Sequence, residues 1–150
     1  LPLNMLEEMR TALMVSHIAA RDVHAVDTGD IFHAATVGGA SALRRDDIGR
    51  VAPGARADLV LVDLDHPAMH PLRDPLRSLV YVAADRAIRD VYVDGRQVVA
   101  DRKVLTLDQA DAAGRLGEAQ RRAARDIPRN DWAGRSADQF APLSLPVTTP

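Results

Sequence analysis

The first regular pattern of apolar and polar residues predicts a helix that begins after Asn4 and ends near Ala20. Along this stretch, apolar or small residues recur at steps of three and four, which places them on one face of a helix. They are Met5, Leu6, Met9, Ala12, Leu13 and Ser16. Asn4 is a favourable N-cap, and Glu7 follows it at the spacing of a capping box.

A second helix is predicted for the stretch DIFHAATVGGASALRR, with Asp27 or Thr28 as its N-cap. Two consecutive glycines, Gly38 and Gly39, lie inside this pattern, and each costs about 1 kcal/mol relative to alanine in a helix. We expect a close approach to a neighbouring strand or helix to offset this cost. An end of the helix at Gly38 is less favoured, because the following ASALRR is itself helix-prone.

The connector that follows predicts a tight turn and then a strand over residues 58–64. Pro53 and Gly54 suit the central positions of a type II turn, where glycine accepts a positive φ. The strand is apolar on both faces from Leu59 to Val62, so both faces are expected to be covered. Asp58 is expected to accept backbone hydrogen bonds that order the turn.

A hairpin is the clearest local signal further along the chain. Asp94 and Gly95 lie between two runs rich in β-branched residues, which predicts a two-residue type I′ hairpin within residues 88–100. Before it, the proline-rich stretch DHPAMHPLRDP predicts a loop, and we expect a helical turn after Pro75.

The C-terminal part of the sequence predicts a helix over residues 106–127, capped by Thr106 or Asp108. The tail at 128–150 is rich in proline and polar residues, so it is expected to be disordered or to lie over a neighbouring surface. If the tail lies over a neighbouring surface, Trp132 and Phe140 would anchor it there.

Composition excludes several classes of function. The 19 basic residues are matched by 21 acidic ones, which argues against a nucleic-acid partner. No apolar run approaches the roughly 20 residues of a membrane span. Cysteine is absent, which excludes disulfides and thiolate metal sites and fits a cytoplasmic location. Because the chain opens on LPLN without an initiator methionine, we expect it to be a piece of a longer polypeptide.

The histidines do not form a metal-binding pattern. Neither a His-x-His pair nor a His-Glu-x-x-His motif occurs, and the prolines at 67 and 71 break any helix that would align His66 with His70. The remaining histidines are isolated, at His17, His24 and His33. Ser41 lies in GGASA, which is not a nucleophile elbow. We therefore predict no catalytic residue, no substrate-binding residue and no metal ligand in this chain.

Three segments together resemble the C-terminal portion of the amidohydrolase superfamily, over residues from Asn4 to Leu105. They are NMLEEMRTALMVSH, HAATVGGASALRRDDIGRVAPGARADLVLVDLD and DPLRSLVYVAADRAIRDVYVDGRQVVADRKVL. The nearest branch contains the cytosine, guanine and 8-oxoguanine deaminases and the triazine chlorohydrolases. The first segment resembles the helix after that family's last metal-binding strand. The second resembles the passage from the last barrel helix into a small β domain.

The resemblance implies an α/β fold, the C-terminal piece of a (β/α)₈ hydrolase barrel plus part of a small β-sandwich-like domain. Residues 1–47 would be the last barrel helices and 48–105 the small β domain, followed by the helix at 106–127 and the tail at 128–150. Gly49 and Gly54 would form the sharp turns between barrel and β domain, and Gly38 and Gly39 would allow close helix–barrel packing.

The activity implied by the resemblance is hydrolytic deamination of a purine, pterin or pyrimidine by hydroxide bound to one divalent metal, Zn²⁺ or alternatively Fe²⁺. The family's metal ligands would all precede Leu1, and Asn4 is the only residue expected to lie near the groups that hold the metal. A triazine-type dechlorinating or dealkylating hydrolase and a non-catalytic β interaction module remain alternatives. The expected partners are a small heterocyclic substrate and further copies of the chain in a homo-oligomer, with no nucleic acid and no membrane.

Overall fold

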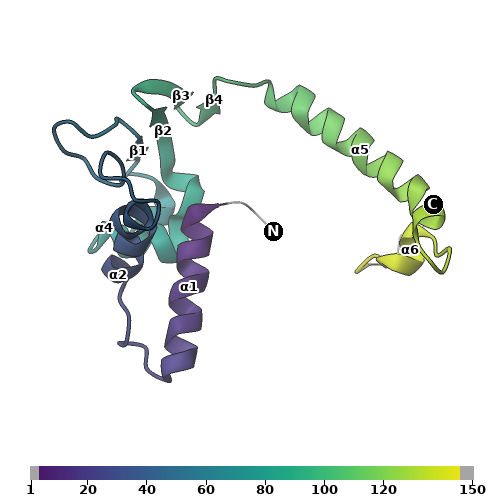
Figure 1. Ribbon diagram of the computed structural model, residues 1–150, viewed down its shortest axis with the longest axis horizontal. Coiled ribbons are helices and arrows are strands. Elements are labelled where there is room, and N and C mark those ends of the chain that lie inside the picture. Colours follow the sequence, from purple (N-terminus) through teal and green to yellow (C-terminus); the bar gives the residue numbers. More distant parts are fainter. Residues whose placement is uncertain (1–3, 146–150) are drawn as a thin grey trace. The chain divides into compact units, whose positions relative to one another are not determined.

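A computed structural model describes residues 4–145 of the chain, which divides into two compact units, Leu1–Thr106 and Leu107–Pro150. The first unit contains short helices and a four-stranded antiparallel sheet, and the second contains a long helix followed by a short one (Figure 1). Both units are described separately below.

The first helix, α1, spans Met5–Ala20 and confirms the predicted boundaries. Asn4 caps it, because its Oδ1 accepts a hydrogen bond from the amide of Leu6 at 3.1 Å. The expected capping box does not form: Glu7 instead lies 3.9 Å from the guanidinium of Arg10, one turn further along. The helix ends at Arg21, whose φ of 54° is left-handed.

The second helical segment is continuous but changes its winding. It consists of α2 at Thr28–His33, a π-helical turn at Ala34–Gly38 and α3 at Gly39–Ala42. Asp27 is the N-cap, in a reciprocal capping box with Asp30. A glycine-rich stretch suits the wider π turn, because the turn brings backbone groups five residues apart together.

Among the described residues no neighbouring element makes the predicted close approach at Gly38 and Gly39, and their packing against a barrel stays a prediction. A Cβ on Gly38 would meet the carbonyl oxygen of His33 at 3.3 Å, which belongs to the same helix and not to a neighbouring element. The close approach occurs instead at Gly49, which has a φ of 78° and whose Cβ would lie 2.6 Å from the carbonyl oxygen of Thr36. The chain therefore returns against the helix at Gly49, where any side chain would collide with the backbone.

The connector then makes the predicted turn. Ala55 donates its amide to the carbonyl of Ala52 at 3.1 Å, and Gly54 has a φ of 82°, as the third position of a type II turn requires. The strand that follows, β1, is shorter than the predicted 58–64 and spans Leu59–Val62. The predicted cover is incomplete on one face, where Val60 is 56% exposed although Val62 packs against the buried cluster around Met69.

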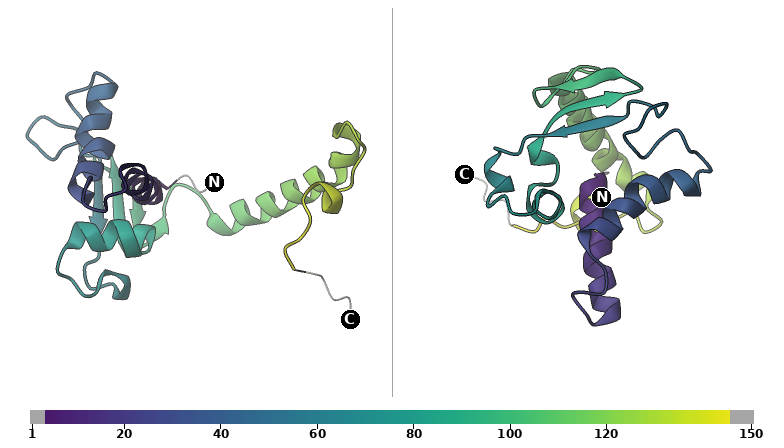
Figure 2. Two further views of the ribbon diagram at one scale, coloured as in Figure 1. Left: turned by 90° about the horizontal axis from the view of Figure 1, so that it is seen from below. Right: turned by 90° about the vertical axis from the view of Figure 1, so that its left-hand side faces the viewer.

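The sheet is antiparallel throughout, in the order β1-β2-β3-β4. Its other strands are β2 at Ile88–Val93, β3 at Arg96–Ala100 and β4 at Lys103–Val104, the last of which was not predicted. The predicted hairpin is confirmed, because Asp94 and Gly95 have φ values of 50° and 77°, both positive as in a type I′ turn. In the right-hand view of Figure 2 the sheet lies above α1 and α2.

Asp58 accepts a backbone hydrogen bond as predicted, but from a distant residue. Its Oδ1 accepts from the amide of Asp94 at 2.7 Å, which joins the start of β1 to the turn of the hairpin. The donor lies 36 residues away, so sequence alone did not identify it.

Helical turns connect β1 to β2. The stretch predicted as loop has no regular structure except a 3₁₀ turn at Pro67–Met69, where Met69 is completely buried and orders the chain. The predicted helical turn after Pro75 is confirmed as α4, Pro75–Ser78, which Asp74 caps. A π-helical turn and a 3₁₀ turn continue it to Ala87.

Two small apolar clusters form the core of the first unit. Met9 and Leu13 of α1 pack with Val80 in one cluster. Met69, Ala83 and Ala87 form the other, against which Val62 of β1 packs. The helices and the sheet are therefore held together mainly through the residues that connect β1 to β2.

The second unit extends beyond the predicted helix. Its long helix, α5, spans Gln109–Asn130, with Asp108 as N-cap, and so includes Pro128 in its last turn. The predicted tail contains a further helix, α6, at Ala137–Phe140, and residues 146–150 lie outside the described part of the chain.

The aromatic residues of this unit contact Arg135, which lies 5.9 Å from the ring of Trp132 and 5.4 Å from that of Phe140. The guanidinium of Arg135 also binds the carboxylate of Asp131 through Nε at 3.0 Å. Trp132 remains 92% exposed, so it does not anchor the tail by burial.

An ionic cluster fixes the connector to the hairpin. Arg45 donates from Nε to Asp47 at 2.8 Å, and Arg56 donates to the same carboxylate at 3.1 Å. Arg56 also lies 3.0 Å from the carboxylate of Asp94 in the hairpin turn. The hydrogen bond from Arg45, together with the one from Arg56, lowers the pKa of Asp47 to about 2.

We predict that replacing Gly95 by valine destabilises the first unit by about 1–2 kcal/mol, the cost of a left-handed conformation for a residue with a Cβ. A Cβ at this position would meet the side chain of Ala57 at 3.9 Å, an ordinary contact, so the cost arises from the backbone. Urea unfolding of Gly95→Val should show this loss. Gly95→Asn is the matched control, since asparagine tolerates positive φ, and an equal loss in both variants would contradict the explanation.

We predict that the contribution of Asp47 to stability is lost in acid. Its pKa is lower in the folded chain than in the unfolded one, so its contribution is complete above pH about 4 and disappears as the pH falls towards about 2. The difference in unfolding free energy between the native chain and Asp47→Asn should therefore shrink over this range. Asp46→Asn, one residue away, serves as control, and a pH-independent difference for Asp47→Asn would refute the prediction.

Candidate functional site

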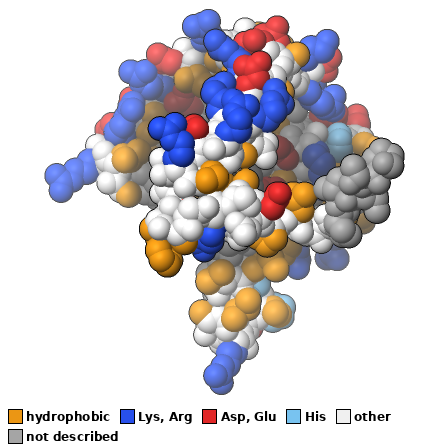
Figure 3. Space-filling model, turned by 90° about the vertical axis from the view of Figure 1, so that its right-hand side faces the viewer, with side chains coloured by type: hydrophobic (Ala, Val, Ile, Leu, Met, Phe, Trp, Pro, Cys, Tyr) orange, Lys and Arg blue, Asp and Glu red, His pale blue; other side chains and the backbone are white. Residues whose placement is uncertain are grey.

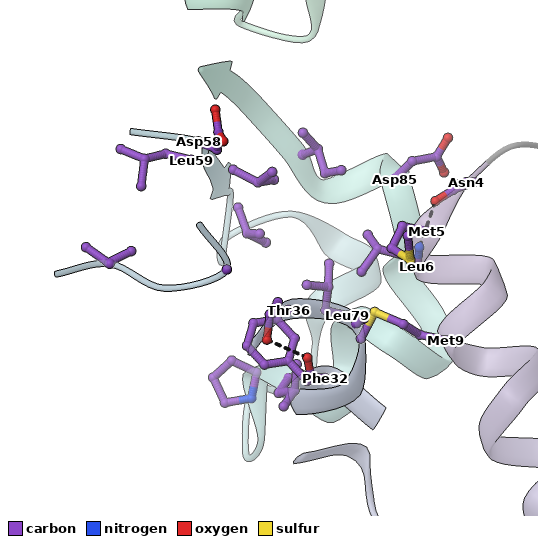
Figure 4. A pocket seen from close by; sticks show the side chains of 18 of the residues that line it. Asn4, Met5, Leu6, Met9, Phe32, Thr36, Asp58, Leu59, Leu79 and Asp85 are labelled. Carbon is purple, nitrogen blue, oxygen red and sulfur yellow. Dashed lines mark hydrogen bonds between the residues drawn. The ribbon is translucent and has the colours of Figure 1, made fainter. Parts of the chain in front are cut away.

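The first unit contains a cavity of ≈ 840 Å³ between β1 and the helices. Figure 4 shows Met5, Leu6 and Met9 on one side of it, Leu59 on another, and Phe32 with Leu79 below. The sequence analysis did not identify this cavity. The one signal for it was the apolar character of the strand at 58–64, because the exposed side chain of Val60 contributes to the cavity wall.

Few polar groups line the cavity, and most of these already have partners. Asn4 caps α1, the hydroxyl of Thr36 donates to the carbonyl of Phe32 at 2.7 Å, and Asp58 accepts from Asp94. The other charged residues of the lining are Arg50 and Asp85. Apolar side chains make up most of the wall.

Asn4 is the one residue that the sequence analysis placed near the expected metal groups. It does line the cavity, but its side-chain oxygen is used in the helix cap. Leu1 to Leu3, which precede it, are outside the described residues. The role of Asn4 beside a metal site therefore stays a prediction.

Two of the histidines, His17 and His66, contact backbone groups and stabilise the fold locally. The Nε2 atom of His17 lies 2.8 Å from the carbonyl oxygen of Val26, which links the end of α1 to the loop before α2. The Nδ1 of His66 accepts from the amide of Ala68 at 3.1 Å and caps the 3₁₀ turn. His70 follows that turn, so no continuous α-helix aligns the two rings, as predicted.

Residues 4–145 contain no group of three or more His, Cys, Asp or Glu side chains placed to hold a metal ion. The donor set in this segment therefore does not fit the divalent metal that the resemblance implies. The same residues include no helix long and apolar enough to cross a membrane.

Hydrogen-bonded ion pairs outside the cavity lower the pKa values of two further carboxylates. Hydrogen bonds from the amide of Asp101 and from Arg89 lower the pKa of Asp90, which ties β2 to the β3–β4 turn. Arg135 lowers the pKa of Asp131 in the second unit. Neither carboxylate lines the cavity, so these shifts record structural pairing and give no acid–base group for catalysis.

Sequence comparison identifies relatives of most of the chain. The sequence model of the Amidohydrolase family matches residues 2–98. The 5-methylthioadenosine/S-adenosylhomocysteine deaminase of Natronomonas pharaonis is 45% identical over 127 residues, which are 85% of this chain and 28% of that protein. The enzyme of the same name from Pelotomaculum thermopropionicum is 39% identical, again over 85% of this chain and 29% of its own length.

Solved structures of related enzymes share the fold of this chain. An adenosine deaminase from Xanthomonas campestris with bound zinc superimposes with a TM-score of 0.73 at 34% identity, over 79% of this chain and 27% of that one. An atrazine chlorohydrolase from Arthrobacter aurescens complexed with zinc gives a TM-score of 0.67 over 75% of this chain and 25% of that one, and at 22% identity it shows the fold alone.

The first unit contains all of the residues that the family model matches. The chain spans less than a third of the length of the curated relatives, so it corresponds to one part of such a protein. The segments that suggested the resemblance lie in this matched region except for residues 99–105, which follow its end. The 150-residue chain belongs to the amidohydrolase family.

Proposed function

We propose that this chain is the scaffold portion of a metal-dependent hydrolase that removes an amino group from a nitrogen heterocycle. The observation that carries the proposal is the similarity to deaminases, at 45% and 39% identity over 127 residues. Because these relatives are named for 5-methylthioadenosine and S-adenosylhomocysteine, an adenosine-type purine is the first substrate class to test. Pterins and pyrimidines are the broader alternatives.

The same proposal gives the elements a place in a larger fold. Helices α1, α2 and α3 would be outer helices of a (β/α)₈ barrel, and the β1–β4 sheet would be part of a β-sandwich-like domain. In support, the adenosine deaminase superimposes over 79% of this chain, and helices with one apolar face suit the outer layer of an α/β barrel. The protein would act as a cytoplasmic homo-oligomer.

Deamination of an aromatic ring needs a water nucleophile activated near neutral pH and a proton donor for the departing ammonia. A divalent metal, Zn²⁺ or alternatively Fe²⁺, would supply the activation, and the zinc in the related adenosine deaminase structure supports this choice. Its ligands would come from polypeptide outside these 150 residues. The present residues would supply position: Gly49 lets the connector pass close to the helix, and the Asp58–Asp94 hydrogen bond joins β1 to the hairpin.

Two alternatives have less support. A triazine dechlorinating or dealkylating enzyme has the same fold, but the 22% identity to the atrazine chlorohydrolase says nothing about its reaction. A non-catalytic β interaction module would leave the similarity to deaminases without an explanation.

We predict that a polypeptide joining this segment to its metal-binding portion releases ammonia from 5′-methylthioadenosine or S-adenosylhomocysteine. The 150-residue chain alone should release none, because its described residues include no cluster of metal-ligating side chains. An ammonia assay over purines, pterins, pyrimidines and triazines measures both. Turnover by the isolated chain would contradict the assignment of the chemistry, and no release by the intact, metal-loaded polypeptide would refute deamination.

We further predict that alanine at any one of the five histidines leaves the metal content of that intact polypeptide near its original value. The variants are His17→Ala, His24→Ala, His33→Ala, His66→Ala and His70→Ala. The contacts of His17 and His66 are to backbone groups of the same unit, which gives each a structural role. Elemental analysis provides the measurement, and loss of the metal from any single variant would show that this segment holds a ligand.

A further inference from the structure

Helix α5 has no buried side chain along its 22 residues. Within residues 107–145, the one other element is the short helix α6, which contacts it (Figure 1). Gly114 and Gly117 lie inside α5, and each costs about 1 kcal/mol relative to alanine. A helix of this composition is marginal by itself in water, because a protein helix is stabilised mainly by the packing of one face. We therefore expect α5 to pack along its length against another element.

One face of α5 has the spacing of apolar residues that packs against a second helix. These residues recur at steps of three and four, which keeps them on one side of the helix over about four turns. Leu116 among them is 71% exposed, so this face is open to solvent. The other members are mostly alanines, which allow two helix axes to approach to about 8 Å. The apolar face consists of Ala112, Leu116, Ala119, Ala123 and Ile127.

A row of charged residues with alternating signs runs beside the apolar face. Arg115 lies 3.7 Å from the carboxylate of Asp111, and Arg122 lies 3.9 Å from that of Glu118, so each pair shares one side of the helix. These four side chains are 59–79% exposed and are accessible to a second molecule. Figure 3 views the chain from the side of the second unit and shows basic, acidic and hydrophobic side chains close together at the surface. The complete charged row is Asp111, Arg115, Glu118, Arg122, Asp126 and Arg129.

The alternation makes the charged row complementary to itself when a second copy runs in the opposite direction. In an antiparallel helix pair, the residues on one side of the apolar face meet the same side of the partner helix, and their charges set orientation and register. With the two copies of Gln120 opposite each other, every charge of the row meets an opposite charge to within one residue. The opposed pairs are Asp111 with Arg129, Arg115 with Asp126, and Glu118 with Arg122.

A parallel pair would not have this complementarity. The charged row would then meet the other side of the apolar face, where uncharged residues follow one another. Exposed ion pairs contribute little stability individually, so the charges select the direction while the apolar face supplies most of the attraction. The uncharged residues on that side are Ala113, Gln120 and Ala124.

We propose that α5 pairs in the antiparallel direction with α5 of a second copy of this chain, through the apolar face. A second copy is the occupant because it presents the same apolar spacing together with the charged row that complements the first in reverse. This inference deepens the proposed function, on whose homo-oligomer it rests, by naming the segment that joins the copies. It does not depend on the proposed reaction.

The absence of cysteine allows the direction of pairing to be measured with single spin labels in the full 150-residue chain. Gln109→Cys, Gln120→Cys and Asn130→Cys are labelled one at a time, and the distance between copies is measured by double electron–electron resonance. At 1.5 Å per residue, antiparallel pairing places the two labels at 109, and likewise the two at 130, about 30 Å apart. The labels at 120 should lie within about 20 Å of each other. Short distances at all three positions would show a parallel pair, and no distance between copies would show a monomer; either result overturns the proposal.

Two matched substitutions locate the pairing face. Leu116→Asp places a charge on the apolar face, whereas Gly114→Asp places the same charge on the opposite side of α5, where a Cβ would meet nothing within 4 Å. In sedimentation equilibrium, we expect Leu116→Asp to raise the dissociation constant of the dimer at least tenfold and Gly114→Asp to leave it within twofold. Equal effects of the two substitutions would show that another surface joins the copies and that the proposal is wrong.

Exchange of charges tests the charged row without depending on whether one variant folds. One variant has an all-basic row, and the other has an all-acidic row. We expect each to be at least tenfold weaker in self-association than the native chain, and the equimolar mixture to form a one-to-one heterodimer. Self-association of both variants at native strength would refute the role of the charged row. The substitutions are Asp111→Arg, Glu118→Arg and Asp126→Arg in the first variant and Arg115→Glu, Arg122→Glu and Arg129→Glu in the second.

Pairing is detected by mass and distance and not by turnover, so the two proposals fail separately. A dimer with the expected distances, in a chain whose intact polypeptide releases no ammonia, would support the pairing and contradict deamination. Ammonia release by the intact polypeptide, with a chain that stays monomeric or a dimer that Leu116→Asp leaves unchanged, would support deamination and overturn the pairing.

Discussion

Packing of residues 67–87 between α1 and the sheet is the interaction on which the first unit depends. Met69, Val80, Ala83 and Ala87 are all completely buried, and together they contribute to both apolar clusters. Val80 holds this segment to α1, and the other three hold it to β1 through Val62. Loss of either contact would separate the helices from the strands, because few other buried side chains join them.

Polar contacts then fix the direction in which the chain passes from helix to strand. Gly49 lets the backbone return against Thr36, where a Cβ would collide with the carbonyl oxygen. Asp47 and Asp58 bind groups on both sides of the connector, through Arg45 and Arg56 in the first case and the amide of Asp94 in the second. The surface ion pairs are exposed and add little stability individually, so their main effect is on geometry.

In the proposed hydrolase, this arrangement would make the segment a scaffold. The described residues contain a rigid turn, a hairpin and helices with apolar faces, and they contain no cluster suited to a metal. The parts that most resemble the amidohydrolase family, around Gly49–Gly54 and Asp94–Gly95, control backbone conformation. In the proposed enzyme, the segment keeps the remaining polypeptide in place and the chemistry occurs elsewhere.

The sequence by itself determined the features that depend on neighbouring residues. Asn4 and Asp27 as helix caps, the turn at Gly54 and the hairpin at Asp94–Gly95 all follow from local rules of capping and positive φ, and the structure confirms them. Family membership also followed from the sequence, because spaced glycines and aspartates in turns are recognisable without coordinates.

Tertiary structure alone decided the features that depend on distant partners. The burial of Met69 orders a stretch predicted as loop, and the partner of Asp58 lies 36 residues away. The cavity beside Val60 could be predicted only in part. The apolar strand indicated that both of its faces pack against other residues, but which side chains stay exposed depends on how the helices and the sheet pack. Local sequence rules fix backbone conformation over a few residues, whereas burial is set by whatever the fold brings against each side chain.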